Sequence, residues 1–338
     1  MAMTLRTRLG ALLYDWPRFE RHLRKRWVLI RNRNETITPN DSGARCDWQF
    51  TSELHIANVF PSAATRLMRR ALDDWPIRFD DAVRFGDAID VTFVIGHRGA
   101  ARLPHLLATL PTIAAQRGAA VECIVVEQSV TREIEPHLPP WVRYVHTPIP
   151  SPAYDYNRAW TLNAGARLAR GEVLILHDND MLVPERYAAE ALRRVREGWD
   201  FADLKRFTFY LPEETTRRIF NGAPLDPAPA TVVQNLQGAS IVASKPAYFD
   251  VGGFDESFVG WGGEDNEFWE RASLHGRVWN WGYLPFVHLF HAAQKEKLRG
   301  GDAAGIRRWQ EVAKIPIEER IRRLRARDSG RLDRPASE

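Results

Sequence analysis

Two aspartates stand two positions apart at the end of an apolar segment. Asp178 and Asp180 follow Val173–Leu176, a run whose composition predicts a buried strand. If the chain stays extended beyond this strand, both carboxylates point to the same side. Neighbouring carboxylates resist joint ionisation unless a cation lies between them, and Mg²⁺ and Mn²⁺ suit such oxygen ligands. The pattern therefore indicates a divalent-cation site, although a surface turn is the commoner explanation of an Asp-x-Asp pair taken alone.

A second group of candidate residues lies in Gly260–Asp265, where three glycines surround Trp261. The glycines permit an unusual backbone, and Glu264 and Asp265 then open a predicted helix that runs to about Leu274. The helix N-terminus favours an ionised Asp265, whereas burial beside Trp261 opposes ionisation. The balance predicts a carboxylate that can take a proton from a sugar hydroxyl. Simple stabilisation of the helix end by two acids explains the spacing equally well.

Two histidines follow the apolar, strand-like residues 283–287. A lone histidine in such a place is more often structural. His288 and His291 are spaced by three in a chain that also offers Asp178 and Asp180, and this combination favours a metal site.

The elements that must position these groups alternate from Ile89 onward. Strands are predicted at 91–95, 121–126, 141–146 and 173–176, and helices at about 103–116 and 155–169. Such alternation predicts an α/β fold with a largely parallel sheet. Because ligands bind at the carboxyl ends of strands in such sheets, we expect Arg98, Glu127 and the Asp178/Asp180 pair to converge on one crevice. The proline-rich segment 211–233 is expected to be a loop that contacts the acceptor substrate, the molecule whose hydroxyl reacts.

Composition is that of a globular protein with 338 residues, of which 44% are hydrophobic and 27% charged. No apolar run is long enough to span a bilayer, and we expect no secretory signal. The two cysteines, Cys46 and Cys123, are far apart in sequence and do not indicate a disulfide framework. These features predict a cytoplasmic protein.

Positive charge is concentrated at the N-terminus. Residues 1–33 hold nine Arg and Lys against two acids, whereas the whole chain has a net charge of only +4, so nucleic acid is not an expected partner. Trp16, Phe19, Leu23 and Trp27 recur at helical spacing. The predicted helix either lies on an anionic membrane at the inner face of the cell or packs on the main domain.

The patterns divide the chain into three parts. They are a basic helical N-terminal extension (1–87), a catalytic domain (88–297) and an Arg-rich helical C-terminal tail (298–338).

Four segments together resemble the β-1,4-galactosyltransferase catalytic domain and its bacterial relatives among family 2 glycosyltransferases. They are 156–159 with 163–165, 177–180 with Pro184, 237–240 with 252–254, and 260–265 through His291. The segments keep the family's order and similar spacing over roughly residues 90–297. The resemblance implies a GT-A fold, in which helices flank a mostly parallel central sheet. It also implies a UDP-sugar donor and Mn²⁺ or Mg²⁺ as cofactor.

The resemblance further implies roles for individual residues. Asp265 matches the catalytic base, and Asp180 and His291 match metal ligands, supported by Asp178. His288 stands where galactosyltransferases have Met. The implied donor-binding residues are His97, Arg98, Glu127, Asn157, Arg158, Asp178, Gly238 and Trp261, and the implied acceptor-binding residues are Trp261, Gly262 and Glu264.

The implied function is inverting, metal-dependent transfer of a hexose, Gal or GalNAc, from a UDP-sugar to a glycan or lipid-linked glycan. Such a reaction would serve bacterial surface polysaccharide or glycolipid synthesis. Asp265 follows Trp-Gly-Gly-Glu, as in the inverting group, where related retaining enzymes have Asn. Asn235 falls in the region where galactosyltransferases place a Tyr that crowds the donor C2 substituent, which favours UDP-GalNAc beside UDP-Gal. The alternatives are a glycoside hydrolase that uses Glu264 or Asp265, and a catalytically silent carbohydrate- or membrane-binding protein.

Overall fold

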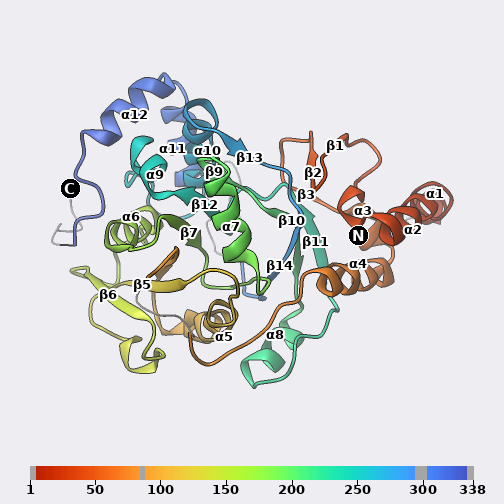
Figure 1. Ribbon diagram of the computed structural model, residues 1–338, viewed down its shortest axis with the longest axis horizontal. Helices are drawn as coiled ribbons and strands as arrows, with labels where there is room; N and C mark the ends of the chain where they lie inside the picture. The colour runs from red at the N-terminus through yellow and green to blue at the C-terminus, as the bar shows by residue number, and fades with distance from the viewer. Residues whose placement is uncertain (1–4, 84–87, 294–302, 333–338) are drawn as a thin grey trace.

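The main sheet of the protein is mostly parallel. In a computed structural model that describes residues 5–83, 88–293 and 303–332, seven strands form this sheet in the order β13-β9-β12-β7-β4-β5-β6 (Figure 1). The strands are β4 (Val91–His97), β5 (Val121–Ser129), β6 (Arg143–Pro148), β7 (Val173–His177), β9 (Phe201–Ala202), β12 (Ser240–Ser244) and β13 (Val278–Trp279). Only β12 among them runs against its neighbours β7 and β9.

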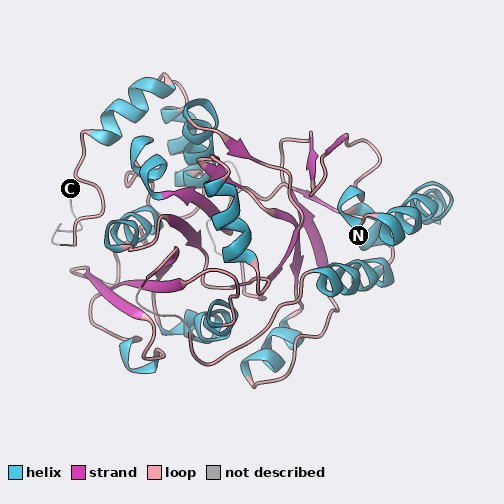
Figure 2. Ribbon diagram, viewed as in Figure 1, coloured by secondary structure: helices cyan, strands magenta, loops and turns pink. Residues whose placement is uncertain are grey.

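Helices cover both faces of this sheet (Figure 2). Phe93 and Ile95 of β4 pack in the same core cluster as residues of α5 (Leu103–Ala114) and α7 (Tyr187–Arg196). Val94, between them, packs on the opposite face with residues of α6 (Arg158–Leu168), α9 (Lys245–Asp250) and α10 (Glu264–His275). A strand buried on both faces reads as a continuous apolar run, as β4 does. The predicted α/β class is confirmed, and the predicted strands and helices from 91 to 176 are present with ends shifted by at most three residues.

A second sheet lies beside the first and has five described strands in the order β3-β11-β10-β14-β8. They are β3 (Ser52–Glu53), β8 (Met181–Leu182), β10 (Lys205–Tyr210), β11 (Thr231–Gln234) and β14 (Leu284–His288). Residues 211–233 are not a loop throughout, because α8 (Glu213–Phe220) and most of β11 fall within them.

The described part of the N-terminal extension packs on the main domain. Phe19 and Leu23 of α2 (Trp16–Lys25) and Trp27 just after it are buried in the same core as Phe93. Arg206 of β10 is buried and donates hydrogen bonds to the carbonyl oxygens of residues 28 and 30. The packed alternative for the predicted amphipathic helix is therefore confirmed. The proposed boundaries at 87/88 and 297/298 fall on residues outside the described ranges.

The remaining described elements belong to the two ends of the chain and to short connections. They are α1 (Leu5–Gly10), η1 (Ala11–Asp15), η2 (Trp27–Leu29), β1 (Ile37–Pro39), β2 (Ala44–Cys46), α3 (His55–Val59), α4 (Pro61–Asp74), η3 (Ala100–Arg102), η4 (Glu135–His137), α11 (Ala304–Val312) and α12 (Ile317–Arg325). Arg320 of α12 is buried and pairs with Glu267 and Glu270 of α10, so this helix is docked on the main domain. Among the residues described, no helix has both the length and the apolar character needed to cross a bilayer.

Candidate active site

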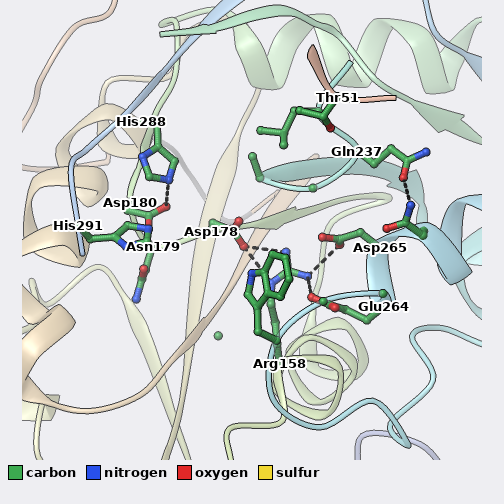
Figure 3. A pocket seen from close by; sticks show the side chains of 18 of the residues that line it. Thr51, Arg158, Asp178, Asn179, Asp180, Gln237, Glu264, Asp265, His288 and His291 are labelled. Carbon is green, nitrogen blue, oxygen red and sulfur yellow. Dashed lines mark hydrogen bonds and ion pairs between the residues drawn. The ribbon is translucent and has the colours of Figure 1, made fainter. Parts of the chain in front are cut away.

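A cavity of about 650 Å³ opens at the carboxyl ends of β4 and β7, where the two sheets meet. Most of the residues singled out from the sequence line it, as Figure 3 shows in part. They are Arg98, Arg158, Asp178, Asp180, Gly238, Trp261, Gly262, Glu264, Asp265, His288 and His291. The predicted convergence of strand ends therefore holds for Arg98, Asp178 and Asp180.

Three predicted donor-binding residues do not line this cavity. His97 is buried, and its Nδ1 lies 3.0 Å from the amide nitrogen of Asn179; burial lowers its pKa to about 4. Glu127 is also buried and accepts hydrogen bonds from the Tyr144 hydroxyl and the backbone N–H of Glu133, so it does not line this cavity, and its contact with the nucleotide stays a prediction. The side chain of Asn157 caps α6 by accepting a hydrogen bond from the N–H of Trp160 at 2.9 Å.

Asp178 and Asp180 do not share a partner. The chain turns at residues 179–180 instead of staying extended. The two carboxylates therefore do not point to the same side, as an extended chain would have required. Asp178 pairs with Arg158, whereas Asp180 faces His288 and His291 (Figure 3). Burial raises the pKa of Asp178 to about 6 against the opposing charge of Arg158. Burial also acts to raise the pKa of Asp180, but the charges of His288, Arg102 and His291 outweigh it and hold that pKa below its usual value.

Asp180, His288 and His291 form a potential metal-binding triad. The Asp180 Oδ1 lies 3.8 Å from His288 Nε2, and Oδ2 lies 3.4 Å from His291 Nε2. All three ligand atoms lie within 4.8 Å of one another. His291 Nδ1 is 2.8 Å from the carbonyl oxygen of Ala292, a contact that favours a proton on Nδ1 and leaves Nε2 free to act as a ligand. One carboxylate and two imidazoles fit Mn²⁺ better than Mg²⁺, which prefers oxygen ligands alone.

The triad depends on the pairing of β8 with β14. In this pairing His288 lies opposite Met181, the residue directly after Asp180. The backbone N–H of Leu289 also donates to the carbonyl oxygen of Asp180 at 2.9 Å. Residues more than 100 positions apart in sequence are thereby fixed side by side.

A guanidinium links the acids at the other end of the cavity. Arg158 donates to Asp178 Oδ1 from Nε and Nη2, at 2.9 and 2.7 Å, and to Asp265 Oδ1 from Nη1 at 3.0 Å. The same Nη1 lies 3.7 Å from Glu264 Oε1. Burial acts to lower the pKa of Arg158, yet the three carboxylates hold it well above the usual value. Whether Arg158 also contacts a nucleotide stays a prediction, since its nitrogens are engaged by these acids.

Glu264 and Asp265 begin α10, as predicted, and this helix runs to His275. Gly260, Gly262 and Gly263 before it all have positive φ, of 82°, 95° and 88°. These angles are readily adopted only by glycine and confirm the unusual backbone expected around Trp261. Burial, reinforced by the neighbouring Asp265, raises the pKa of Glu264 to about 7. The acidic pair is thus held inside the cavity wall and is not a solvated helix end.

Gly238 lies directly against the carboxylate of Asp265. A Cβ at this position would meet Asp265 Oδ2 at 2.5 Å, which is closer than real contacts allow. The segment around it is fixed to α10, because Trp269 donates from its indole to the carbonyl oxygen of Gln237 at 2.8 Å. Gly238 therefore has a positioning role toward Asp265 that the sequence did not reveal.

The structure also adds residues that the sequence did not single out. Arg102 donates to Asp180 Oδ2 at 3.2 Å, and Gln49, Phe50 and Thr51 of the N-terminal extension line the cavity. Asn235 is not among the residues lining this cavity, so it does not support a choice between UDP-Gal and UDP-GalNAc. No local sequence pattern marks these contacts, which join distant parts of the chain.

The fold and the cavity define an α/β protein with an acidic pair at one end of its site and an Asp-His-His triad at the other. Residues 229–283, which include the segment from Gly260 to Asp265, match the family model described as the N-terminal domain of galactosyltransferase. The resemblance found in the motifs is thereby confirmed. Over these residues the chain is similar to a family of glycosyltransferases, as its motifs indicate.

Two solved structures resemble the chain at low similarity. One is the mannosyltransferase PcManGT from Pyrobaculum calidifontis in complex with GDP-Man and Mn²⁺. It is 16% identical with a TM-score of 0.43, over 79% of this chain and 81% of that one. The other is residues 1–349 of S. aureus TarS, 14% identical with a TM-score of 0.41, over 60% and 59% of the two chains. These scores are too low to transfer a donor or a metal. A search of curated proteins found no significant match.

The contact between Gly238 and Asp265 leads to a testable expectation. Gly238→Ala should displace the Asp265 carboxylate and, if Asp265 is the base that the motif resemblance implies, lower the rate of sugar transfer at least about tenfold. Nucleotide release measures the rate, and thermal unfolding checks the fold. Gly10→Ala is the matched control, since a Cβ there meets nothing within 4 Å. Equal transfer rates for the Gly238 and Gly10 variants would show that Gly238 does not position Asp265.

Proposed function

We propose that this protein is an inverting, metal-dependent glycosyltransferase that moves Gal or GalNAc from a UDP-sugar to a hydroxyl of a glycan acceptor. The observation that carries the proposal is the position of Asp265. It begins α10, accepts a hydrogen bond from Arg158 and opens on the same cavity as the Asp180-His288-His291 triad. A base and a cation site at opposite ends of one cavity suit attack on a sugar held between them.

The residues at the acidic end supply the acceptor chemistry. Asp265 takes the proton from the acceptor hydroxyl as its oxygen bonds to C1 of the donor sugar, while the bond from C1 to the diphosphate oxygen breaks. Attack opposite the leaving group inverts the anomeric centre. Glu264, whose pKa is raised to about 7, is half protonated near neutral pH and can both donate and accept hydrogen bonds with the acceptor. Trp261 provides an aromatic wall for the sugar rings.

The Asp180-His288-His291 triad is the proposed cation site. A divalent cation bound there would offset the negative charge that develops on the departing nucleoside diphosphate. Arg102, already paired with Asp180, adds a fixed positive charge at this end. We therefore expect the diphosphate to bind near the triad and the acceptor near Asp265.

The role of Asp265 is tested by Asp265→Asn. The amide keeps an oxygen for Arg158 but cannot take a proton, so transfer should fall by about 10²–10⁴-fold while UDP binding persists. A panel of UDP-sugars with Mn²⁺ and nucleotide release gives the rates, and calorimetry gives UDP affinity. Asp250→Asn, at an exposed position of α9 that does not line the cavity, is the control. Near-normal transfer would sink the base assignment, and absence of UDP binding to the unmodified protein would favour a hydrolase.

The cation site is tested by His291→Ala. Loss of one imidazole should weaken Mn²⁺ binding at least about tenfold, measured by titration of the free protein with Mn²⁺. EDTA should abolish transfer by the unmodified protein, and added Mn²⁺ should restore it. His275→Ala, at an exposed position at the end of α10, should bind Mn²⁺ normally. Unchanged Mn²⁺ affinity in the His291 variant would place the cation elsewhere.

We further propose peripheral contact with the inner face of the cell membrane, where a lipid-linked glycan acceptor is at hand. The helix face first considered, on α2, is buried in the core. Exposed apolar residues gather instead on α1 and η1, at one edge of the molecule (Figure 1): Leu5, Leu9, Leu12, Leu13 and Tyr14. Arg8 in the same helix and the exposed Arg24 of α2 provide attraction to anionic lipid.

This membrane proposal predicts a liposome result. The unmodified protein should float with anionic liposomes and much less with neutral ones, and the double variant Leu9→Asp, Leu13→Asp should lose flotation. Both side chains are exposed, so the double substitution should not change the melting temperature of the protein. Equal recovery with neutral and anionic lipid would contradict the proposal.

A further inference from the structure

A loop of the N-terminal extension forms one side of the active-site cavity. Gln49, Phe50 and Thr51 line that cavity although they lie far from the catalytic domain in sequence. The amide of Asn235 donates to the carbonyl oxygen of Trp48 at 2.7 Å, and the Thr51 hydroxyl donates to the carbonyl oxygen of Asn235 at 3.1 Å. These bonds, with the pairing of β3 and β11, fix the loop beside the acidic end of the site.

A second cavity of about 440 Å³ adjoins the first and shares Gln49, Leu236 and Gln237 with it. Two of the shared residues, Leu236 and Gln237, directly precede Gly238, where an added Cβ would meet Asp265. In Figure 3, Gln237 and Thr51 lie on the side of Asp265, away from His288 and His291. The second cavity therefore adjoins the base end of the active site and not the metal end.

Two exposed aromatic rings span the junction of the cavities. Phe50 lines the first cavity and Trp48 lines the second, and their rings meet edge to face at 5.7 Å. Trp48 is 47% exposed and Phe50 60% exposed, so neither ring serves the core. A flat aromatic face exposed in a cavity can stack on the apolar face of a sugar ring.

The rest of the second cavity is polar and suits sugar hydroxyls. Two of its three cations are paired: Arg45 lies 3.5 Å from Asp47, and Lys205 lies 2.8 Å from Asp203. The third, Arg206, is buried and donates to the carbonyl oxygens of residues 28 and 30 and to the side chain of Gln234. Paired charges leave hydrogen-bonding capacity without a strong net attraction for anions, which favours neutral sugar units over acidic ones. Trp269 adds a second indole to the lining.

We propose that this second cavity is a subsite for the sugars that precede the acceptor residue, and that the acceptor is a neutral oligosaccharide or the end of a polysaccharide. The terminal hydroxyl reaches Asp265, and the preceding units cross the rings of Phe50 and Trp48. This inference rests on the proposed glycosyl transfer in the first cavity. It gives the N-terminal extension a part in acceptor recognition.

The test is binding to an array of linear oligosaccharides of one to six neutral hexose or N-acetylhexosamine units, with UDP and Mn²⁺ present. The unmodified protein should bind chains of three or more units at least about tenfold more tightly than single sugars. Trp48→Ala and Phe50→Ala should remove most of this preference, and Trp48→Tyr should retain it, because a phenol ring also stacks on sugars. Phe79→Ala is the control, since Phe79 is 43% exposed and lines neither cavity.

Two outcomes overturn the inference: no dependence on chain length in the unmodified protein, which includes the absence of any glycan binding, and a dependence that survives Trp48→Ala and Phe50→Ala unchanged. Its failure is distinguishable from failure of the proposed function. UDP binding by the unmodified protein and loss of transfer in Asp265→Asn test the first cavity alone. If these succeed while chain length has no effect, only the subsite is wrong.

Discussion

The arrangement of the active site depends on one guanidinium held among three carboxylates. Arg158 contacts Asp178 after β7 and Asp265 at the start of α10, with Glu264 close by. Three acids buried together without a cation would repel and take up protons. With Arg158 between them, the three acids stay close enough to form one wall of the cavity, and strand β7 and the helices α6 and α10 are joined at a single point. The side chain of Asn157 caps α6 and so fixes the backbone position from which the Arg158 side chain extends toward these acids.

A second constraint is the short link between the two sheets. The chain leaves β7 of the first sheet, turns at residues 179–180 and enters β8 of the second within four residues. This turn sends Asp178 toward Arg158 and Asp180 toward the histidines that follow β14. Two carboxylates so near in sequence thereby lie toward opposite ends of one cavity, and the separation of the proposed base from the proposed cation site follows from the path of the backbone.

Sequence patterns predicted the strands and helix ends that depend on residues close together in the chain. The apolar runs of β4, β5 and β7 predicted the strands of the sheet, and the glycines followed by Glu264 and Asp265 predicted the start of α10. Contacts between residues that are far apart in the sequence produce no such local pattern. A Cβ at position 238 would clash with Asp265, and the buried Glu127 accepts a hydrogen bond from Tyr144. The Asp178–Asp180 spacing left both an extended chain and a turn open, because a strand's periodicity does not determine the path of the chain after the strand ends.

The N-terminal extension is one of the two parts that the family resemblance does not cover, yet three of its residues line the cavity. Asn235 and Ala239 have positive φ, of 57° and 75°, which is uncommon for residues other than glycine. Such a backbone persists only when its surroundings hold it. The N-terminal loop does so by bonding Asn235 on both its amide and its carbonyl oxygen, while α10 holds Gln237. The bonds from the loop to Asn235 support this strained segment and also bring Phe50 to the cavity, so the N-terminal loop contributes both to the shape of this end of the cavity and to the stability of its wall.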